Sequence, residues 1–134
     1  MLRQGLVFAA AVAAFGLAAC DTRAKAPTDK GVCYTVTLKE GQPPKFNKLA
    51  ENQATLENCI AQLENVRVRF LRMGGSRREL TGAYQGQFLF VDPTGVAISR
   101  SLEGGRFYAF TRTPDGQLVI PGAVYSGPAQ PEQK

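Results

Sequence analysis

The second half of the chain is divided into short segments by sequences that are typical of tight turns. Asp92-Pro93-Thr94-Gly95 has an acid first, proline second and glycine fourth, as a type I turn prefers, and Thr113-Pro114-Asp115-Gly116 repeats this chemistry. Leu102-Glu103-Gly104-Gly105 offers a further turn. The segments between the turns alternate in the period of a β-strand, and they span residues 80–91, 96–100, 106–113 and 117–120. Short strands joined by tight turns pair as antiparallel neighbours, so this region is predicted to form a meander.

The region before residue 66 is predicted to add one strand and one helix. Residues 32–38 alternate and are rich in β-branched side chains, which favours a strand. A loop with two prolines follows, and Asn47 is the predicted N-cap of a helix that starts near Lys48. The apolar stripe of this helix comprises Leu49, Leu56, Cys59, Ile60 and Leu63. The predicted fold class is α+β: one amphipathic helix packed on a small antiparallel β-sheet of four to six strands, a meander.

Residues 66–72 fit two interpretations. Val66, Val68 and Phe70 alternate with arginines, as in a strand. Val66 and Phe70 also continue the helical stripe, and Gly74-Gly75 would end a helix well. We favour a helix to about Glu64 followed by a strand, with a continuous helix as the alternative.

The aromatic residues of the meander are expected to lie mostly in the core, and they are Tyr84, Phe88, Phe90, Phe107, Tyr108 and Phe110. If residues 80–91 form one strand, Tyr84, Phe88 and Phe90 share one face, while Leu89 and Val91 lie on the other. We expect Leu89, Val91 and Phe107 to line an exposed apolar groove if the helix covers only one side of the sheet.

The first twenty residues carry a targeting signal. Arg3 precedes an apolar run over residues 5–17, which is too short to span a bilayer and is typical of a secretory signal. The boundary Leu17-Ala18-Ala19-Cys20 resembles the lipobox of bacterial lipoproteins, and the resemblance covers residues 1–20 only. It implies cleavage before Cys20, lipidation of Cys20, and attachment to a membrane of the cell envelope with the domain facing the periplasm. An ordinary signal peptide with an unmodified Cys20 is the alternative.

The resemblance implies a signal peptide (1–19) and a lipidated Cys20. The residue patterns beyond it predict a flexible tether to residue 31, a globular domain (32–121) and a disordered tail (122–134). Residues 21–31 and 122–134 are polar or proline-containing and have no apolar period. Asp21 follows the lipidated cysteine, where in enterobacterial lipoproteins an Asp resembles the signal for retention at the inner membrane. Sorting rules differ among bacteria, so the choice between inner and outer membrane stays open.

The chain has three cysteines. If Cys20 carries lipid in an oxidising compartment, Cys33 and Cys59 are left to form a disulfide. The bridge would close a loop of about 25 residues and stabilise the domain by roughly 3–4 kcal/mol. Two unpaired buried thiols are the alternative.

The sequence contains no histidine, which excludes the common Ser-His-Asp and Cys-His arrangements and removes the most frequent metal ligand. Asp92, Glu103 and Asp115 are explained by turns. A hydrolytic pair such as Glu79 with Glu103 would need a fold that brings them to about 5–9 Å. We therefore expect no catalytic residues, no metal site and no cofactor, and we expect that the protein is not an enzyme.

One cluster suggests binding, and it comprises Arg67, Arg69, Arg72, Arg77 and Arg78. Guanidinium groups suit bidentate contact with phosphate or carboxylate, although a solvated surface is the simpler interpretation. The net charge of +5 suits a protein beside anionic lipid and is too small to indicate nucleic acid. The favoured hypothesis is a non-enzymatic envelope lipoprotein that acts as a protein-interaction or assembly module with an envelope protein partner. The alternative is a binding module for anionic lipid or cell-wall polymer through the Arg67–Arg78 cluster.

Overall fold

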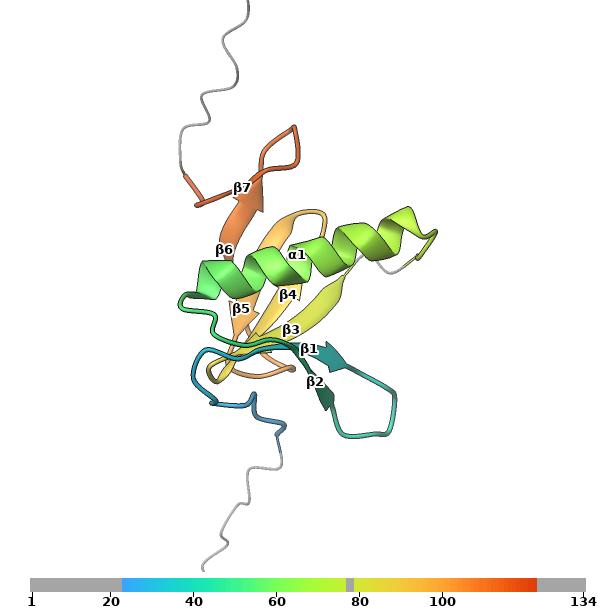
Figure 1. Ribbon diagram of the computed structural model, residues 1–134, viewed down its shortest axis with the longest axis vertical. Helices are drawn as coiled ribbons and strands as arrows, with labels where there is room; N and C mark the ends of the chain where they lie inside the picture. Colours follow the sequence, from blue (N-terminus) through green and yellow to red (C-terminus); the bar gives the residue numbers. More distant parts are fainter. Residues whose placement is uncertain (1–22, 77–78, 123–134) are drawn as a thin grey trace, which may run out of the picture.

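The computed structural model describes residues 23–76 and 79–122, and these residues form an α+β fold. One helix lies across a seven-stranded antiparallel sheet whose strand order is β2-β1-β3-β4-β5-β6-β7 (Figure 1). The elements are β1 (Cys33–Thr37), β2 (Lys45–Ala50), α1 (Leu56–Arg72), β3 (Leu80–Tyr84), β4 (Gln87–Val91), β5 (Gly95–Ser99), β6 (Phe107–Arg112) and β7 (Leu118–Val119). The fold class is confirmed, but the sheet is larger than the small meander of four to six strands that the sequence predicts.

The segment 80–91 is a hairpin and not one strand. β3 and β4 are joined by a two-residue turn in which both Gln85 and Gly86 have positive φ, and Tyr84 pairs with Gln87 across it. Such turns match the twist of the paired strands. Because Tyr84 and Gln87 are opposite each other, Tyr84 shares a face with Leu89 and Val91. The predicted grouping of Tyr84 with Phe88 and Phe90 is therefore wrong.

The segment 45–50 is a strand, so the prediction of a helix that starts near Lys48 is also wrong. Asn47 pairs with Thr35 in the β1–β2 ladder and donates a side-chain hydrogen bond to Thr37 (3.1 Å). The N-cap of α1 is Thr55, whose Oγ1 accepts a hydrogen bond from the backbone N–H of Asn58 (3.3 Å). The pairing with β1 outweighs the weak helical pattern of residues 48–55.

Residues 66–72 are helical, which corrects the favoured prediction of a strand. α1 continues to Arg72 and ends at Met73, followed by Gly74 with a φ of 82°. The N–H of Gly75 donates a hydrogen bond to the carbonyl of Phe70 (3.0 Å), so the glycines close the helix in the usual way. The alternation of valine and arginine did not decide the structure, because the same apolar residues fit a helical stripe.

One layer of the core lies between α1 and the sheet. It contains Cys59, Ile60 and Leu63 from the helix, packed against buried residues of the strands that include Cys33, Leu89 and Val91. The disulfide between Cys33 and Cys59 joins β1 to α1 within this layer, with a Cα–Cα distance of 5.3 Å. The predicted bridge is confirmed, and it lies in the core, where both cysteines are fully buried.

A second layer covers the opposite face of the sheet. Phe88 and Phe90 are buried there beneath Ala26, Phe46 and Leu102, and the guanidinium of Arg106 lies 3.4 Å from the centre of the Phe90 ring. The expected apolar groove of Leu89, Val91 and Phe107 is therefore absent from the described residues. Leu89 and Val91 lie beneath the helix and are fully buried, whereas the side chain of Phe107 is 63 % exposed.

The second core layer also includes part of the segment that the sequence suggested was a tether. Ala26 is buried, and the carbonyl of Pro27 accepts a hydrogen bond from the N–H of Gly86 (2.8 Å). Gly31 is held by the side chain of Gln85 (3.0 Å). The packed structure therefore begins at Ala26, before the first strand.

Candidate functional site

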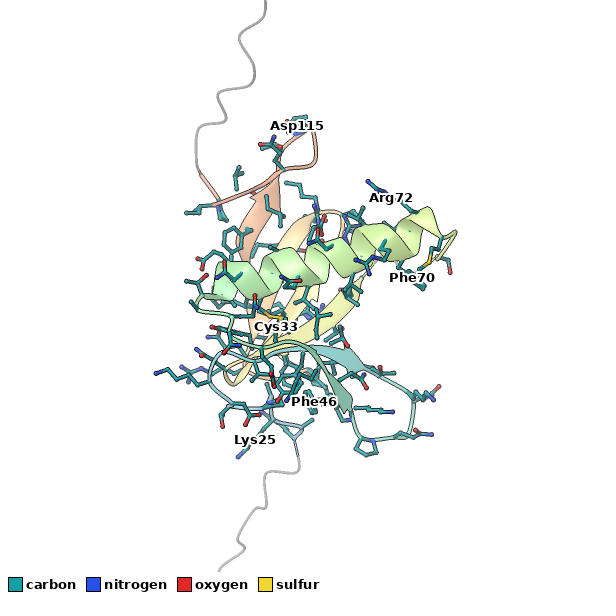
Figure 2. All side chains as sticks on the ribbon, viewed as in Figure 1. Lys25, Cys33, Phe46, Phe70, Arg72 and Asp115 are labelled. Atoms are coloured by element: carbon teal, nitrogen blue, oxygen red, sulfur yellow. A yellow bond between two sulfur atoms is a disulfide. The ribbon has the colours of Figure 1, made fainter. Side chains whose placement is uncertain are left out.

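The C-terminal end of α1 is exposed on every side. Arg69, Phe70, Leu71 and Arg72 are all exposed, and four consecutive residues cover more than one full turn of an α-helix. Met73, which follows them, is 73 % exposed. Figure 2 shows Phe70 and Arg72 at this end of the helix, away from the buried Cys33. We call residues 69–73 the helix tip.

The helix tip is exposed because the sheet supports only the earlier part of α1. The buried residues of the helix are Cys59, Ile60 and Leu63, and Val66 to Val68 are half-buried. In Figure 1 the C-terminal end of α1 extends past the strands on which its first turns lie. The helix therefore continues for a full turn beyond the point where packing against the core ends.

The conformation of the helix tip is supported by the turn that follows it. Gly75 packs directly against the ring of Phe70, since a Cβ at position 75 would lie only 2.1 Å from a ring carbon. Phe70 also lines a small hollow of about 140 Å³ with Val66, Arg67 and Leu80. One side of Phe70 thus rests on its own turn, while the side chain as a whole remains 40 % exposed.

The helix tip carries positive charge on one flank. Arg69 and Arg72 lie three residues apart, on neighbouring positions of the helix surface, and line a shallow open hollow with Asn65 and Val68. Phe70 and Leu71, which lie between the two arginines in the sequence, are 40 % and 38 % exposed. The tip therefore combines two guanidinium groups with three large apolar side chains within five residues.

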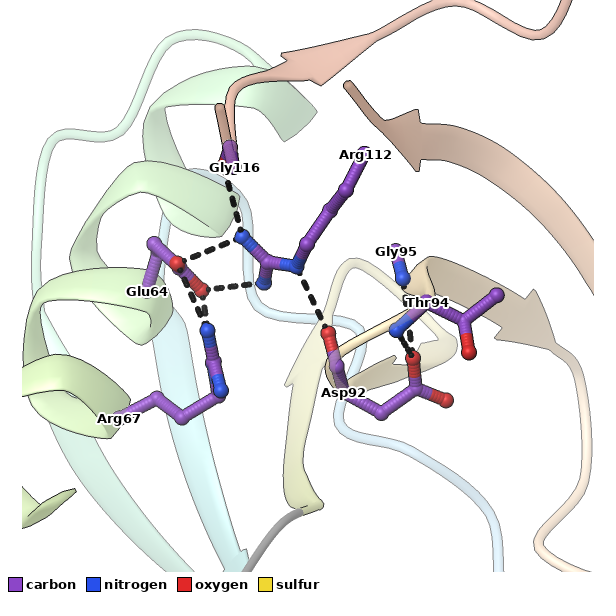
Figure 3. Close-up of polar contacts among 7 residues, drawn as sticks. All are labelled: Glu64, Arg67, Asp92, Thr94, Gly95, Arg112 and Gly116. Atoms are coloured by element: carbon purple, nitrogen blue, oxygen red, sulfur yellow. Dashed lines mark hydrogen bonds and ion pairs between the residues drawn. The ribbon is translucent and has the colours of Figure 1, made fainter. Parts of the chain in front are cut away.

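Arg67 is separated from this charged surface by a partly buried ion-pair network (Figure 3). The Glu64 carboxylate accepts hydrogen bonds from Arg67 (3.0 and 3.1 Å) and from Arg112 (2.8 Å for both Nη1 and Nη2). The Arg112 guanidinium also donates to the carbonyls of Asp92 (2.9 Å) and Gly116 (3.2 Å). The side chains of Arg67 and Arg112 are only 11 % and 10 % exposed. This network connects α1 to β6, to the turn between β4 and β5 at Asp92, and to the turn between β6 and β7 at Gly116.

The network determines the protonation of Glu64. Its partial burial would by itself raise the pKa of the carboxyl, but hydrogen bonds from Arg112 and Arg67, together with their charges, lower the pKa from 4.5 to about 2. Arg67 uses its Nε and Nη2 in the bidentate contact with Glu64 and is largely buried, so its main role is structural.

The sequence-predicted site residues therefore separate into three groups. Arg69 and Arg72 come together at the helix tip, whereas Arg67 turns away into the ion-pair network. Arg77 and Arg78, together with Cys20, lie outside the described residues. Sequence reasoning missed Phe70, Leu71 and Met73 as surface residues because it favoured a strand for residues 66–72. The missed signal was that the alternative, a helical stripe continued through Phe70, runs longer than one small sheet can cover.

Two further observations bear on function. Within residues 23–76 and 79–122 no helix has the length and apolar character that crossing a membrane requires. The same part of the chain contains no group of three or more histidine, cysteine or acidic residues placed to hold a metal ion.

Comparison with known proteins finds no family model, no curated protein and no solved structure that matches this chain.

Proposed function

We propose that this protein is a membrane-anchored lipoprotein of the cell envelope that acts by binding and not by catalysis. Two observations support this proposal. The lipobox resemblance at Leu17–Cys20 predicts a lipid anchor on Cys20, and the Cys33–Cys59 disulfide fits a protein that folds in an oxidising compartment. Asp21 matches the inner-membrane retention signal of enterobacterial lipoproteins, and the choice between inner and outer membrane stays open.

The binding surface in this proposal is the helix tip, Arg69–Met73. The single observation that carries this assignment is that a complete turn of the only helix among the described residues is exposed, although it contains three large apolar side chains. Large apolar side chains that are exposed together mark interaction surfaces far more often than scattered ones do. The domain folds without burying them, so they are available to a partner.

The lipid anchor is tested by intact-mass analysis of the protein isolated from its own membrane. The expected mass is that of residues 20–134 plus the acyl groups on Cys20. A Cys20→Ala protein should lose both the added mass and the membrane association. An unprocessed chain with an unmodified Cys20 would overturn the anchor and the envelope location together.

The binding surface is tested with a photo-reactive amino acid placed at Met73 in intact cells. The matched control places it at Glu57, which is exposed on the first turn of the same helix. We expect adducts with membrane lipid or with a defined envelope protein from position 73 and not from position 57. Equal yields at both positions would show that the tip is not a contact surface.

A second candidate function, a protein-interaction or assembly module, is favoured by strand β2. This strand lies at the edge of the sheet, is six residues long and pairs only with β1 among the described strands. An exposed edge of this kind can accept a strand from a partner, although Lys45 and Lys48 oppose unspecific pairing. Photo-crosslinking from Lys45 to one defined envelope protein would support this candidate, and labelling of lipid alone would dismiss it.

A further inference from the structure

We propose that the helix tip inserts its apolar side chains into the anionic surface of the bilayer that carries the anchor. This inference rests on the proposed function and names the partner of the same surface. The occupant is an anionic phospholipid bilayer, in which Phe70, Leu71 and Met73 reach the acyl boundary and the arginines contact phosphates.

The distribution of exposure around the helix favours a bilayer over a protein groove. A groove in a protein buries one face of a helix, at positions spaced three and four residues apart. Here Arg69, Phe70, Leu71 and Arg72 are exposed on all sides of the axis. A lipid interface can surround such an end, because it is fluid and contacts every side chain that enters it.

The chemistry of the side chains matches the two layers of a bilayer surface. Phe, Leu and Met are apolar and enter the boundary between headgroups and acyl chains. Arg69 and Arg72 have planar guanidinium groups that suit bidentate contact with phosphate, and their long stems let the charge stay at headgroup level. Both arginines lie within four residues of Phe70, Leu71 and Met73, so the two contacts form together.

Two acidic residues near the tip, Glu64 on the same helix and Glu79 beside the hollow of Phe70, are engaged elsewhere. Glu64 is bound by Arg67 and Arg112, and Glu79 pairs with Arg106 (3.0 Å). Both carboxylates are thus paired with arginines other than Arg69 and Arg72. The positive charge of the tip therefore faces outward and complements an anionic surface.

The length of the chain that leads to the anchor keeps the domain at the membrane. Ala26 is fixed in the second core layer, and the six residue steps from Cys20 to Ala26 can span at most about 20 Å. A tether this short confines the whole domain, including the tip, to the space next to the bilayer. Even a modest affinity of the tip is then sufficient for contact.

The absence of tryptophan from the sequence allows a sharp test. A Met73→Trp substitution places a single tryptophan at the most exposed apolar position of the tip, and Glu57→Trp places one on the exposed first turn of α1. The lipid-anchored full-length mature protein is reconstituted in vesicles of phosphatidylethanolamine and phosphatidylglycerol that contain lipids with brominated acyl chains. We expect blue-shifted, quenched emission from Trp at position 73 and unquenched emission at position 57.

Two arginine variants test the charge contribution in the Met73→Trp background. Replacing Arg69 and Arg72 by Gln should lower the ratio of inserted to free tips by about fivefold for each arginine, the change expected for one basic residue near an anionic surface. Replacing both by Lys keeps the charge and should retain most of the quenching. Replacing phosphatidylglycerol by phosphatidylcholine should act like the Gln variants.

The outcomes separate this inference from the proposed function. A protein that floats with the vesicles while position 73 stays as accessible as position 57 overturns the insertion and leaves the anchor intact. Quenching that does not respond to phosphatidylglycerol or to the Gln variants overturns the role of anionic lipid. Shielding of position 73 only in native membranes assigns the tip to a protein partner instead. A protein that does not float at all overturns the anchor and this inference with it.

Discussion

The part of α1 from Leu56 to Arg67 and the helix tip differ in their packing, in their covalent link to the sheet and in their ion pairs. The first part holds Cys59, Ile60 and Leu63 in the core, a disulfide to β1 and the ion pairs of Glu64. The tip has no buried side chain and ends in Met73, the most exposed of the large apolar residues described. One continuous helix therefore contains a segment that the core requires and a segment that it does not.

This comparison indicates that the residues that stabilise the fold and the residues that are free to bind a partner lie in different segments of the same helix. Substitutions at Cys59, Leu63 or Glu64 should change the free energy of unfolding, because they remove packing, a covalent link or an ion pair. Substitutions at Arg69, Arg72 or Met73 should leave that free energy nearly unchanged and alter only binding. The following predictions test this separation, beginning with the largest effect.

Removing the disulfide should cause the greatest loss of stability. Replacing both Cys33 and Cys59 by Ala opens a loop between residues 26 positions apart and should lower the free energy of unfolding by about 3–4 kcal/mol. Urea unfolding followed by circular dichroism measures the change. A reducing agent should have no further effect on the double variant. A loss below about 1 kcal/mol would show that the disulfide is not a main source of the stability that holds the first part of α1 on the sheet.

Glu64→Gln should come second, with a loss of about 2–3 kcal/mol at pH 7, because Arg67 and Arg112 lose their buried counter-charge. The pKa of Glu64 is about 2 in the folded protein and about 4.5 when unperturbed, so the unfolded state binds the proton first. The stability from this carboxylate is therefore present above about pH 4.5 and is lost as the pH falls toward 2.

Unfolding free energies measured from pH 6 to pH 2 check the ion-pair prediction. The Glu64→Gln protein should show a smaller loss over this range than the natural sequence. Glu57→Gln, on the exposed first turn, is the matched control and should leave the curve unchanged. If the free energy of unfolding depended on pH in the same way for the natural protein and for Glu64→Gln, the ion pairs of Glu64 would not be stabilising this part of α1.

Gly82→Ala should have a smaller effect that acts on the same part of the helix. A Cβ at position 82 of β3 would lie 2.4 Å from the Cδ1 of Leu63 and 3.0 Å from the carbonyl oxygen of Tyr34. Relieving this overlap should cost about 1–2 kcal/mol by thermal or urea unfolding. Gly105→Ala, where a Cβ meets nothing within 4 Å, is the control. Equal stabilities of the two variants would mean that α1 shifts freely on β3.

Met73→Ser should have the smallest effect, within about 0.5 kcal/mol, because the side chain is exposed and supports no buried contact. The same urea measurement applies. The Arg72→Gln protein should behave similarly. A destabilisation above about 1 kcal/mol in either variant would contradict the separation, since the tip would then belong to the folded core.

The amino-acid sequence determined the features that depend on neighbouring residues. The strand at 32–38, the strands from Val96 onward and the turn at Asp92 are present, and the side chain of Asp92 accepts hydrogen bonds from the N–H groups of Thr94 (2.7 Å) and Gly95 (2.9 Å). Period-two alternation and turn chemistry act within a few residues, so they can be interpreted without the fold. The turn at Gln85-Gly86 could have been predicted by the same reasoning. Because it was missed, Tyr84 was assigned to the face of Phe88 and Phe90 instead of the face of Leu89 and Val91.

Only the tertiary structure decided what each of the ambiguous segments became. Residues 45–50 are a strand because β1 pairs with them, and residues 66–72 are helical although they also alternate. Arg67 and Arg69 look equivalent in the sequence, yet Arg67 is bound to Glu64 and Arg69 is exposed. The same Glu64 carboxylate also binds Arg112, which is 48 residues away in the chain, and this contact joins the ion pair of the helix to the sheet. The physical reason is that burial and ion pairing are long-range properties, set by which elements meet, whereas residue patterns report only on the local backbone.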